Sequence, residues 1–361
     1  MDWFRDLDPP AQAAVIAGAV AIVTAMVAAI NTTLNTWLKD RLERRIAATR
    51  RREAERETYR RYAEPLTEAA SALFWRLREI FEVPGGGYYL ERGGGETPFE
   101  SYKATSTRFR IAALLGWIAA LKRELLLSDA TTDPSVEALR SVVAGVEASL
   151  ADGGHVELDR ADVVLEALGL TRAGDAEMAR LGRQINSTLK RSLHWAGASA
   201  IGDLDPSAGA ALVATVKELV RVSCHAQSAV PASSDDALLA ALDVREAWIY
   251  RDWQEAIGEA MLEPAVGNAR SFDVKGYRGF VRMTETPEPF DGPWFGRLNE
   301  LTSDLDIAAD IRLDARIRQL RGVLVAVARL IQEFHAVEPG QSSVFPSTVD
   351  AVMATLGSSG A

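Results

Sequence analysis

Twenty consecutive residues near the N-terminus, 11–30, carry no charged side chain. A helix of this length spans about 30 Å, the thickness of the hydrocarbon core of a membrane. A buried helix of a soluble protein shows a polar face at helical spacing, and only Gln12 and Thr24 are candidates for one here. A cleaved signal peptide has a basic start and a shorter apolar core, whereas this chain begins MDWFRDLDPP. The pattern therefore favours a transmembrane helix, placed at 11–36 after a short external segment, 1–10.

The helix predicted over 37–62 is rich in Arg, Glu and Ala, with a few apolar residues on one face. Residues 39–61 hold ten Lys or Arg against five Asp or Glu, whereas Arg5 is the one basic residue before the apolar stretch. Basic residues that flank a span are retained in the cytoplasm. We therefore expect a single-pass protein of the cytoplasmic (inner) membrane with its N-terminus outside. The basic residues expected to face anionic lipid are Lys39, Arg41, Arg44 and Arg45. A solvated spacer is the other interpretation of this helix.

Small residues recur every four positions within the apolar stretch, which would let two helix backbones approach closely. These anchor residues are Ala13, Ala17, Gly18, Ala21, Ala25 and Ala29. They suggest a homo-oligomer formed through the anchor, although about half of this segment consists of small residues and such a register can arise by chance.

The rest of the chain predicts an all-α fold. Apolar residues recur at helical spacing through 63–339, which we interpret as a helical-bundle domain interrupted by a glycine-rich loop at 84–96. Residues 234–261 are expected to form one helix, 269–283 have strand-like content, and 340–361 are expected to be a loosely held tail. Apolar residues from Leu313 to Phe334 alternate at four and three positions, which is typical either of a coiled coil or, as we prefer, of a bundle packing face.

Charge and composition exclude some functions. The chain has 361 residues, 48% of them hydrophobic, and a formal net charge of −10. Because the residues beyond 61 are acidic overall, we expect no nucleic-acid partner. One cysteine, Cys224, permits no intrachain disulfide.

The sequence offers little catalytic chemistry. Its four histidines are scattered, and the carboxylates Asp252, Glu255 and Glu259 share a helical face without the Glu-x-x-His elements of a di-iron site. The glycine-rich loop lacks the flanking pattern of a phosphate-binding loop. We therefore assign no catalytic residue, no metal ligand and no cofactor.

Five blocks resemble an uncharacterised family of bacterial helical proteins, several of which have an N-terminal hydrophobic segment: YRRYAEPLTEAASALFWRL, YKATSTRFRIAALLGWIAALKREL, RDWQEAIGEAML, VKGYRGFV and PWFGRLNEL. The resemblance implies no activity. It implies that polar and aromatic residues of these blocks belong to one packed unit, in which Arg123, Glu124, Gln254 and Glu259 form a hydrogen-bond network or line a polar pocket.

Two functions follow as expectations. The first is a non-enzymatic scaffold or sensor, anchored in membrane lipid, that presents its helical surface to an unknown protein partner. The second is an enzyme or ligand-gated effector with its pocket at Arg123, Glu124, Gln254 and Glu259. Converging side chains around a deep cleft would favour the second, and mutually paired side chains the first.

Overall fold

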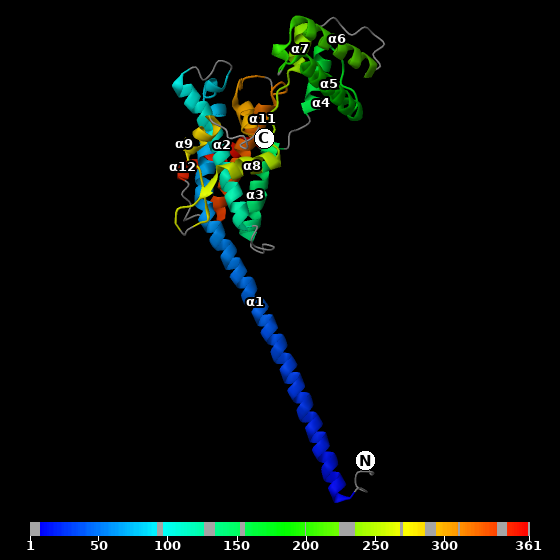
Figure 1. The fold of residues 1–361 in the computed structure, drawn as a ribbon, viewed down its shortest axis with the longest axis vertical. Coiled ribbons are helices and arrows are strands. Elements are labelled where there is room, and N and C mark those ends of the chain that lie inside the picture. Colours follow the sequence, from blue (N-terminus) through cyan, green and yellow to red (C-terminus); the bar gives the residue numbers. More distant parts are fainter. Residues whose placement is uncertain are drawn as a thin grey trace. The chain divides into compact units, whose positions relative to one another are not determined.

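The computed structural model is mostly helical, and it describes residues 8–91, 97–125, 134–151, 156–198, 200–223, 235–267, 270–285, 294–309, 311–337 and 345–359 (Figure 1). The chain divides into two units, one formed by the first part of α1 up to Glu57 and the other beginning at Thr58. The two units are described separately below.

From Pro9 on, the described part of the first unit is helical, as the N-terminal portion of α1, Pro9–Glu82. Within the described residues, one stretch, Pro9–Arg50, is long and apolar enough to cross a membrane. Its apolar side chains lie open to the surroundings, with 60% of Val20 and 58% of Ile22 exposed. Water is a poor solvent for so many unpaired apolar side chains on one helix.

The boundaries expected at 36/37 and 62/63 are not breaks in the structure, because α1 continues through both. Pro65 lies inside this helix although it has no N–H to donate to the preceding turn. Two residues later the Thr67 hydroxyl donates to the carbonyl of Ala63 at 2.6 Å, which adds a side-chain contact to the same turn.

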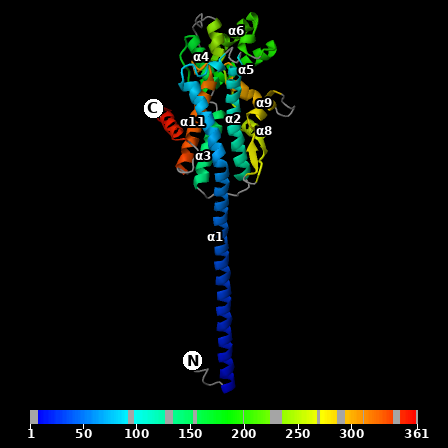
Figure 2. The ribbon, with the colours of Figure 1, turned by 90° about the vertical axis from the view of Figure 1, so that its left-hand side faces the viewer.

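The second unit contains a main core that the C-terminal part of α1 enters with an apolar stripe from Tyr62 to Ile80. Around it lie η2 (Tyr88–Leu90), α2 (Pro98–Leu125), α3 (Pro134–Ala151), α8 (Arg251–Met261), α9 (Tyr277–Glu285), α10 (Trp294–Thr302), α11 (Ala315–Val337) and α12 (Pro346–Ser359). Figures 1 and 2 show α3 beside α11 and α2 beside α8, in agreement with the packing of these pairs. The apolar face of α11 from Ile317 to Phe334 is buried in this core, within one chain.

A separate core joins α4 (Val156–Ala167), α5 (Asp175–Ala196), α6 (Pro206–Ser223) and α7 (Asp235–Leu242), with η3 (Ile201–Asp203) between α5 and α6. The only strands in the described part of the chain, β1 (Leu262–Pro264) and β2 (Phe272–Val274), pair antiparallel. The strand-like content expected at 269–283 therefore yields three strand residues, and Tyr277 begins a helix.

Three expected elements differ from the structure. The single helix expected over 234–261 is wrong, because α7 ends at Leu242 and α8 begins at Arg251. The backbone between them pairs with other segments: Arg245 N–H donates to the Leu313 carbonyl at 2.9 Å, and Ile249 N–H donates to the Leu150 carbonyl at 2.9 Å. These bonds take the place of helical ones.

The C-terminal segment 340–361 was expected to be loosely held, but residues from Pro346 form α12, which packs against α11 and buries Val352. Part of the glycine-rich loop is ordered as well. Tyr89 and Leu90, in η2, are buried in the main core, while residues 92–96 of the loop lie outside the described residues.

Candidate functional site

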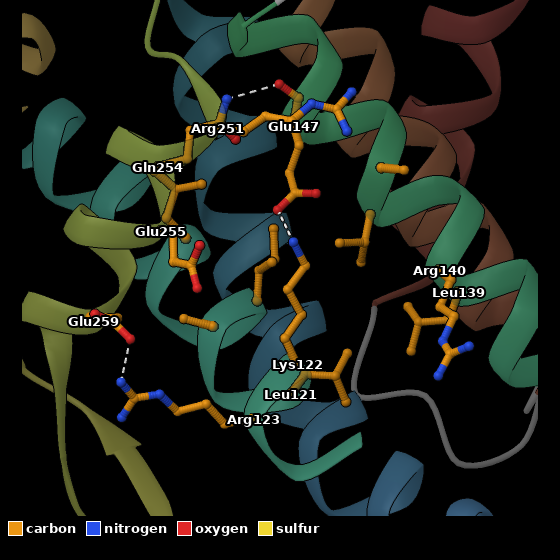
Figure 3. Close-up of a pocket in the computed structure, with 15 residues that line it drawn as sticks. Leu121, Lys122, Arg123, Leu139, Arg140, Glu147, Arg251, Gln254, Glu255 and Glu259 are labelled. Carbon is orange, nitrogen blue, oxygen red and sulfur yellow. Dashed lines mark hydrogen bonds and ion pairs between the residues drawn. The ribbon is translucent and has the colours of Figure 1, made fainter. Parts of the chain in front are cut away.

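A cavity of about 540 Å³ lies among α2, α3 and α8 (Figure 3). Helices α2 and α8 pack closely because Gly258 has no side chain at their contact: a Cβ there would lie 2.7 Å from the Leu115 carbonyl oxygen. The apolar part of the cavity wall consists of Leu115, Ile118, Ala119, Leu121, Leu139, Val143 and Ala144. Such a wall suits apolar groups of a bound molecule or of a partner's side chains.

Charged residues from all three helices surround this wall, and ion pairs join several of them. Figure 3 shows Lys122 reaching toward Glu147, and Arg123 facing Glu259; both pairs are ion pairs. The side chain of Glu147 is 13% exposed, whereas those of Arg123 and Glu259 are 43% and 46% exposed. Exposed pairs of this kind contribute little to stability because water screens them. The Arg123 guanidinium also lies 5.6 Å from the centre of the Phe272 ring.

Gln254 lines the cavity but is fixed by backbone groups. It is 2% exposed, and its Nε2 donates to the carbonyls of Glu147 at 2.9 Å and Ile249 at 2.7 Å. These bonds tie the C-terminal end of α3 to the segment before α8. The Oε1 atom is buried and has no hydrogen-bond partner among the described residues.

Three of the four residues expected to form a polar network or pocket, Arg123, Gln254 and Glu259, line this cavity. Glu124 is not among the residues that line the cavity. It acts instead on Tyr62, whose hydroxyl accepts from the Phe272 N–H at 3.4 Å. Burial raises the pKa of Tyr62, and the Glu124 carboxylate adds to this effect. Arg123 is the last residue of α2 that lines the cavity, and the side chain of Glu124, next along the helix, lies beside Tyr62 instead.

Several residues of the cavity were not identified from the sequence, among them Lys122, Arg140, Glu147 and Arg251. Helical spacing could have identified some of them. Arg140 and Glu147 lie on one face of α3, and Arg251 and Glu255 lie on one face of α8. Asp252, which shares the carboxylate face expected for Glu255 and Glu259, does not line the cavity. Within the described residues, no group of three or more His, Cys, Asp or Glu is placed to hold a metal ion. Cys224 lies outside the described residues.

Aromatic rings connect several blocks of the expected packed unit. Tyr102 of α2 and Tyr277 of α9 make an edge contact with ring centres 5.7 Å apart, and Phe109 contacts both Tyr277 and Phe280, at 5.5 and 5.7 Å. Helix α9 therefore packs on α2 through rings as well as aliphatic groups.

The expected lipid-facing residues of α1 are exposed and make contacts along the helix. Arg44 pairs with Asp40 at 2.7 Å, Lys39 lies 4.0 Å from Glu43, and the Arg41 guanidinium lies 5.1 Å from the Trp37 ring centre. Of the anchor residues, Gly18 has open space where a Cβ would stand. At Gly18, therefore, no other described part of the chain packs against the small-residue face of the helix.

Comparison of the chain with known protein families, with curated proteins and with solved structures gives no match.

Proposed function

We propose that this chain is a single-pass protein of the bacterial cytoplasmic membrane that serves as a scaffold or sensor. In this proposal residues 11–36 lie in lipid, the N-terminus lies outside, and the helical bundle formed by the second unit acts in the cytoplasm by binding another protein. The observation that carries the proposal is the exposed apolar surface of α1, on which Val20, Ile22 and Val27 are each about 60% exposed. Lipid is the environment that such a surface favours.

The flanking residues support the orientation. Aromatic rings favour the headgroup layer, and Trp37 follows the apolar stretch with 54% of its surface exposed. Next come Lys39, Arg41, Arg44 and Arg45, all exposed. Two local pairs neutralise part of this charge, but the 39–61 segment keeps five more basic than acidic residues. The excess favours retention on the cytoplasmic side and contact with anionic lipid near the base of the helix.

The surface proposed for the protein partner is the cavity among α2, α3 and α8. Its apolar wall and charged rim resemble the arrangement of an interface, in which an apolar centre is surrounded by polar groups. The paired state of Arg123 and Glu259, and the bonding of Gln254 to backbone, support a docking surface more than a catalytic site. The resemblance to an uncharacterised bacterial family is compatible with this proposal and adds no activity to it.

The first experiment tests whether the chain is held in the membrane and on which side its second unit lies. The full chain, expressed in a bacterial host, should stay in the membrane pellet after a carbonate wash. A C-terminal green fluorescent protein fusion should fluoresce, whereas a C-terminal alkaline phosphatase fusion should be inactive. A chain found in the supernatant, or an active phosphatase fusion, would overturn the anchor or its orientation.

The partner is tested by photocrosslinking in intact cells. A photoreactive amino acid at Glu255, which is exposed at the cavity, should yield a discrete crosslinked protein. Ala144 is exposed and lines the cavity, so Ala144→Arg should fill it and remove that product without removing a core side chain. Gly145→Arg is the matched control, because Gly145 is exposed next to it but does not line the cavity. Crosslinking that survives Ala144→Arg would contradict the docking surface.

A second candidate is a ligand-gated effector that binds an apolar small molecule in the same cavity. The volume of about 540 Å³ lies within the range of small-molecule sites. In this case the photoreactive residue captures no protein. The amphiphilic dye anilinonaphthalene sulfonate then binds the purified wild-type chain and the Gly145→Arg variant, but not the Ala144→Arg variant.

A further inference from the structure

Basic side chains gather where the C-terminal part of α1 meets η2 and the first turns of α2. The Arg76 side chain is 6% exposed and that of Lys103 is 16% exposed. Both pair with Glu79: Arg76 Nη1 lies 2.9 Å from Glu79 Oε2, and Lys103 Nζ contacts the other carboxylate oxygen. Arg76 Nη2 also donates to the Ser106 hydroxyl at 3.2 Å. One carboxylate therefore serves two cations, of which Arg76 is buried and Lys103 is partly buried.

Arg110, two helical turns beyond Lys103 on α2, brings a third positive charge to this group. Its guanidinium lies within electrostatic range of Arg76, Tyr89, Tyr102 and Glu79. Burial lowers the pKa of Arg110, and the positive charge of Arg76 lowers it further. In the described part of the chain Arg110 makes no ion pair. Arg76, Lys103 and Arg110, called the basic cluster from here on, share Glu79 and keep a formal excess of two positive charges.

Such an excess is unfavourable in a partly buried place, because like charges repel and little water is present to solvate them. One donor of the basic cluster is also unused: the Nε of Arg76 is buried and has no hydrogen-bond partner among the described residues. Guanidinium groups match the geometry of tetrahedral and planar oxyanions, and burial strengthens such charge-assisted bonds. The excess positive charge of the basic cluster points to an oxyanion as its ligand.

A route to the basic cluster exists beside Arg110. This residue lines a cavity of about 590 Å³ between α1 and α2, together with Ala72 and Phe109. Two exposed carboxylates, Glu64 and Glu68, also line the cavity. Its other lining cation, Arg270, pairs with Asp273 at 3.4 Å, whereas Arg110 makes no ion pair in the described part of the chain. An anion in this cavity is thus favoured at its Arg110 end.

We propose that the basic cluster is a binding site for a phosphate-type oxyanion, either a free phosphate or phosphate ester or the phosphate of a lipid headgroup. The anion binds at Arg110 and offsets the excess charge of Arg76 and Lys103. This proposal does not depend on the membrane anchor or on the cavity among α2, α3 and α8, since the three residues belong to the second unit.

The test follows thermal unfolding of the full chain, purified in a neutral detergent, while inorganic phosphate replaces chloride at constant ionic strength. We expect a saturable rise in Tm, because a ligand that binds only the folded state stabilises it. Arg110→Gln should weaken the apparent affinity about ten- to a hundredfold, which is the range for loss of a charged hydrogen-bond donor. The same variant should also have a higher Tm than the wild type without phosphate, because it removes the unpaired charge.

Arg108→Gln is the matched control. Arg108 lies on the same helix, burial lowers the pKa of its guanidinium as well, and its electrostatic neighbour is Tyr277 instead of the basic cluster. We expect it to keep the response to phosphate. Arg110→Lys keeps the charge and should retain part of the affinity. Absence of a phosphate effect on the wild type, or an equal loss in Arg108→Gln and Arg110→Gln, would overturn the proposal.

Two further arms identify the source of the oxyanion. Glycerol 3-phosphate represents a soluble ester, and phosphatidic acid in mixed micelles represents a headgroup. Stabilisation by the soluble ester at concentrations similar to inorganic phosphate indicates a free ligand. Stabilisation at much lower concentrations of phosphatidic acid, lost in Arg110→Gln, indicates a lipid. A response to phosphatidic acid that Arg110→Gln leaves unchanged would contradict binding at the basic cluster.

Discussion

The strongest test of the anchor is a single charge at its centre, Val20→Arg. Val20 lies in the middle of the uncharged stretch 11–30, and 60% of its surface is exposed on α1. The substituted side chain would therefore face the surroundings of the helix. In water an exposed Val-to-Arg change on a helix is close to neutral, whereas in lipid it is costly.

The magnitude follows from the composition of the stretch. Each of its seven Val or Ile residues favours insertion by about 0.3 to 0.6 kcal/mol, about 2 to 4 kcal/mol together, while its nine Ala are nearly neutral. Arginine at the centre of a span opposes insertion by about 2.5 to 3.5 kcal/mol, and the substitution also removes the contribution of Val20. The change of about 3 to 4 kcal/mol equals the whole favourable term. We therefore expect the equilibrium constant for insertion to fall by about two orders of magnitude, so that the inserted fraction drops from nearly complete to about one half or less.

The assay is the fraction of the full chain that remains in carbonate-washed membranes, quantified by immunoblot. Ile46→Arg is the control, because Ile46 is 43% exposed on the same helix but lies beyond the apolar stretch. It should leave the membrane fraction unchanged. If Val20→Arg stays in the pellet as completely as Ile46→Arg, the helix is held there by something other than lipid insertion.

Further substitutions test the packing of the second unit. Arg316 is 4% exposed, pairs with Asp314 through two bonds of 2.8 and 2.6 Å, and donates to the carbonyls of Glu300, Ser303 and Asp304. Arg316→Ala should therefore lower the free energy of unfolding by about 3 to 5 kcal/mol in urea titrations followed by circular dichroism; a change near zero would contradict this. Burial raises the pKa of Asp243, although Arg245 lies 3.7 Å away. The folded pKa lies above the unfolded one, so the ionised group lowers stability once the pH rises past about 4. Asp243→Asn should thus be more stable than the wild type at pH 7, with a difference that vanishes at lower pH; equal stability at pH 7 would refute the sign. Gly258→Val should cost about 1 to 3 kcal/mol because its Cβ would meet Leu115 O at 2.7 Å and Ala119 Cβ at 2.8 Å. Gly145→Ala, which meets open space, should cost nothing in the same titration.

Much of the fold could be predicted from the periodicity of apolar residues, because one buried face is enough to reveal a helix. The stripe from Leu66 to Ile80 and the face of α11 are buried where their spacing predicted. The boundary at 62/63 could not be predicted in the same way. A change from a charged to an apolar face alters what surrounds a helix but leaves its backbone hydrogen bonds intact, so α1 continues through the change and through Pro65.

The segment 243–250 shows what periodicity misses. Its apolar residues Val244, Ala247, Trp248 and Ile249 are all buried, so their spacing resembles that of a helix buried on several sides. The backbone conformation of this segment is set by hydrogen bonds from residues that are distant in the sequence. Arg160 donates to the carbonyls of Leu242 and Val244, and Gln319 donates to that of Ala247. Side chains from other elements thus donate to carbonyls that would otherwise accept hydrogen bonds within a helix. These donors are distant in the sequence, so the spacing of residues within 243–250 cannot predict them.

The two candidate sites also differ in how far the sequence could predict them. At the cavity among α2, α3 and α8, Arg123 of α2 and Glu259 of α8 form an ion pair. The resemblance placed both residues in one polar network or pocket, whereas helical spacing alone gives no reason to bring them together. The resemblance groups Arg123 with Glu124, whereas in the structure Arg123 lines the cavity and Glu124 lies beside Tyr62. The basic cluster lay within the same blocks and was missed, since Arg76, Lys103 and Arg110 look like ordinary charged residues along two helices. Only the loss of solvent around them, together with a single carboxylate for three cations, makes an anion the expected partner.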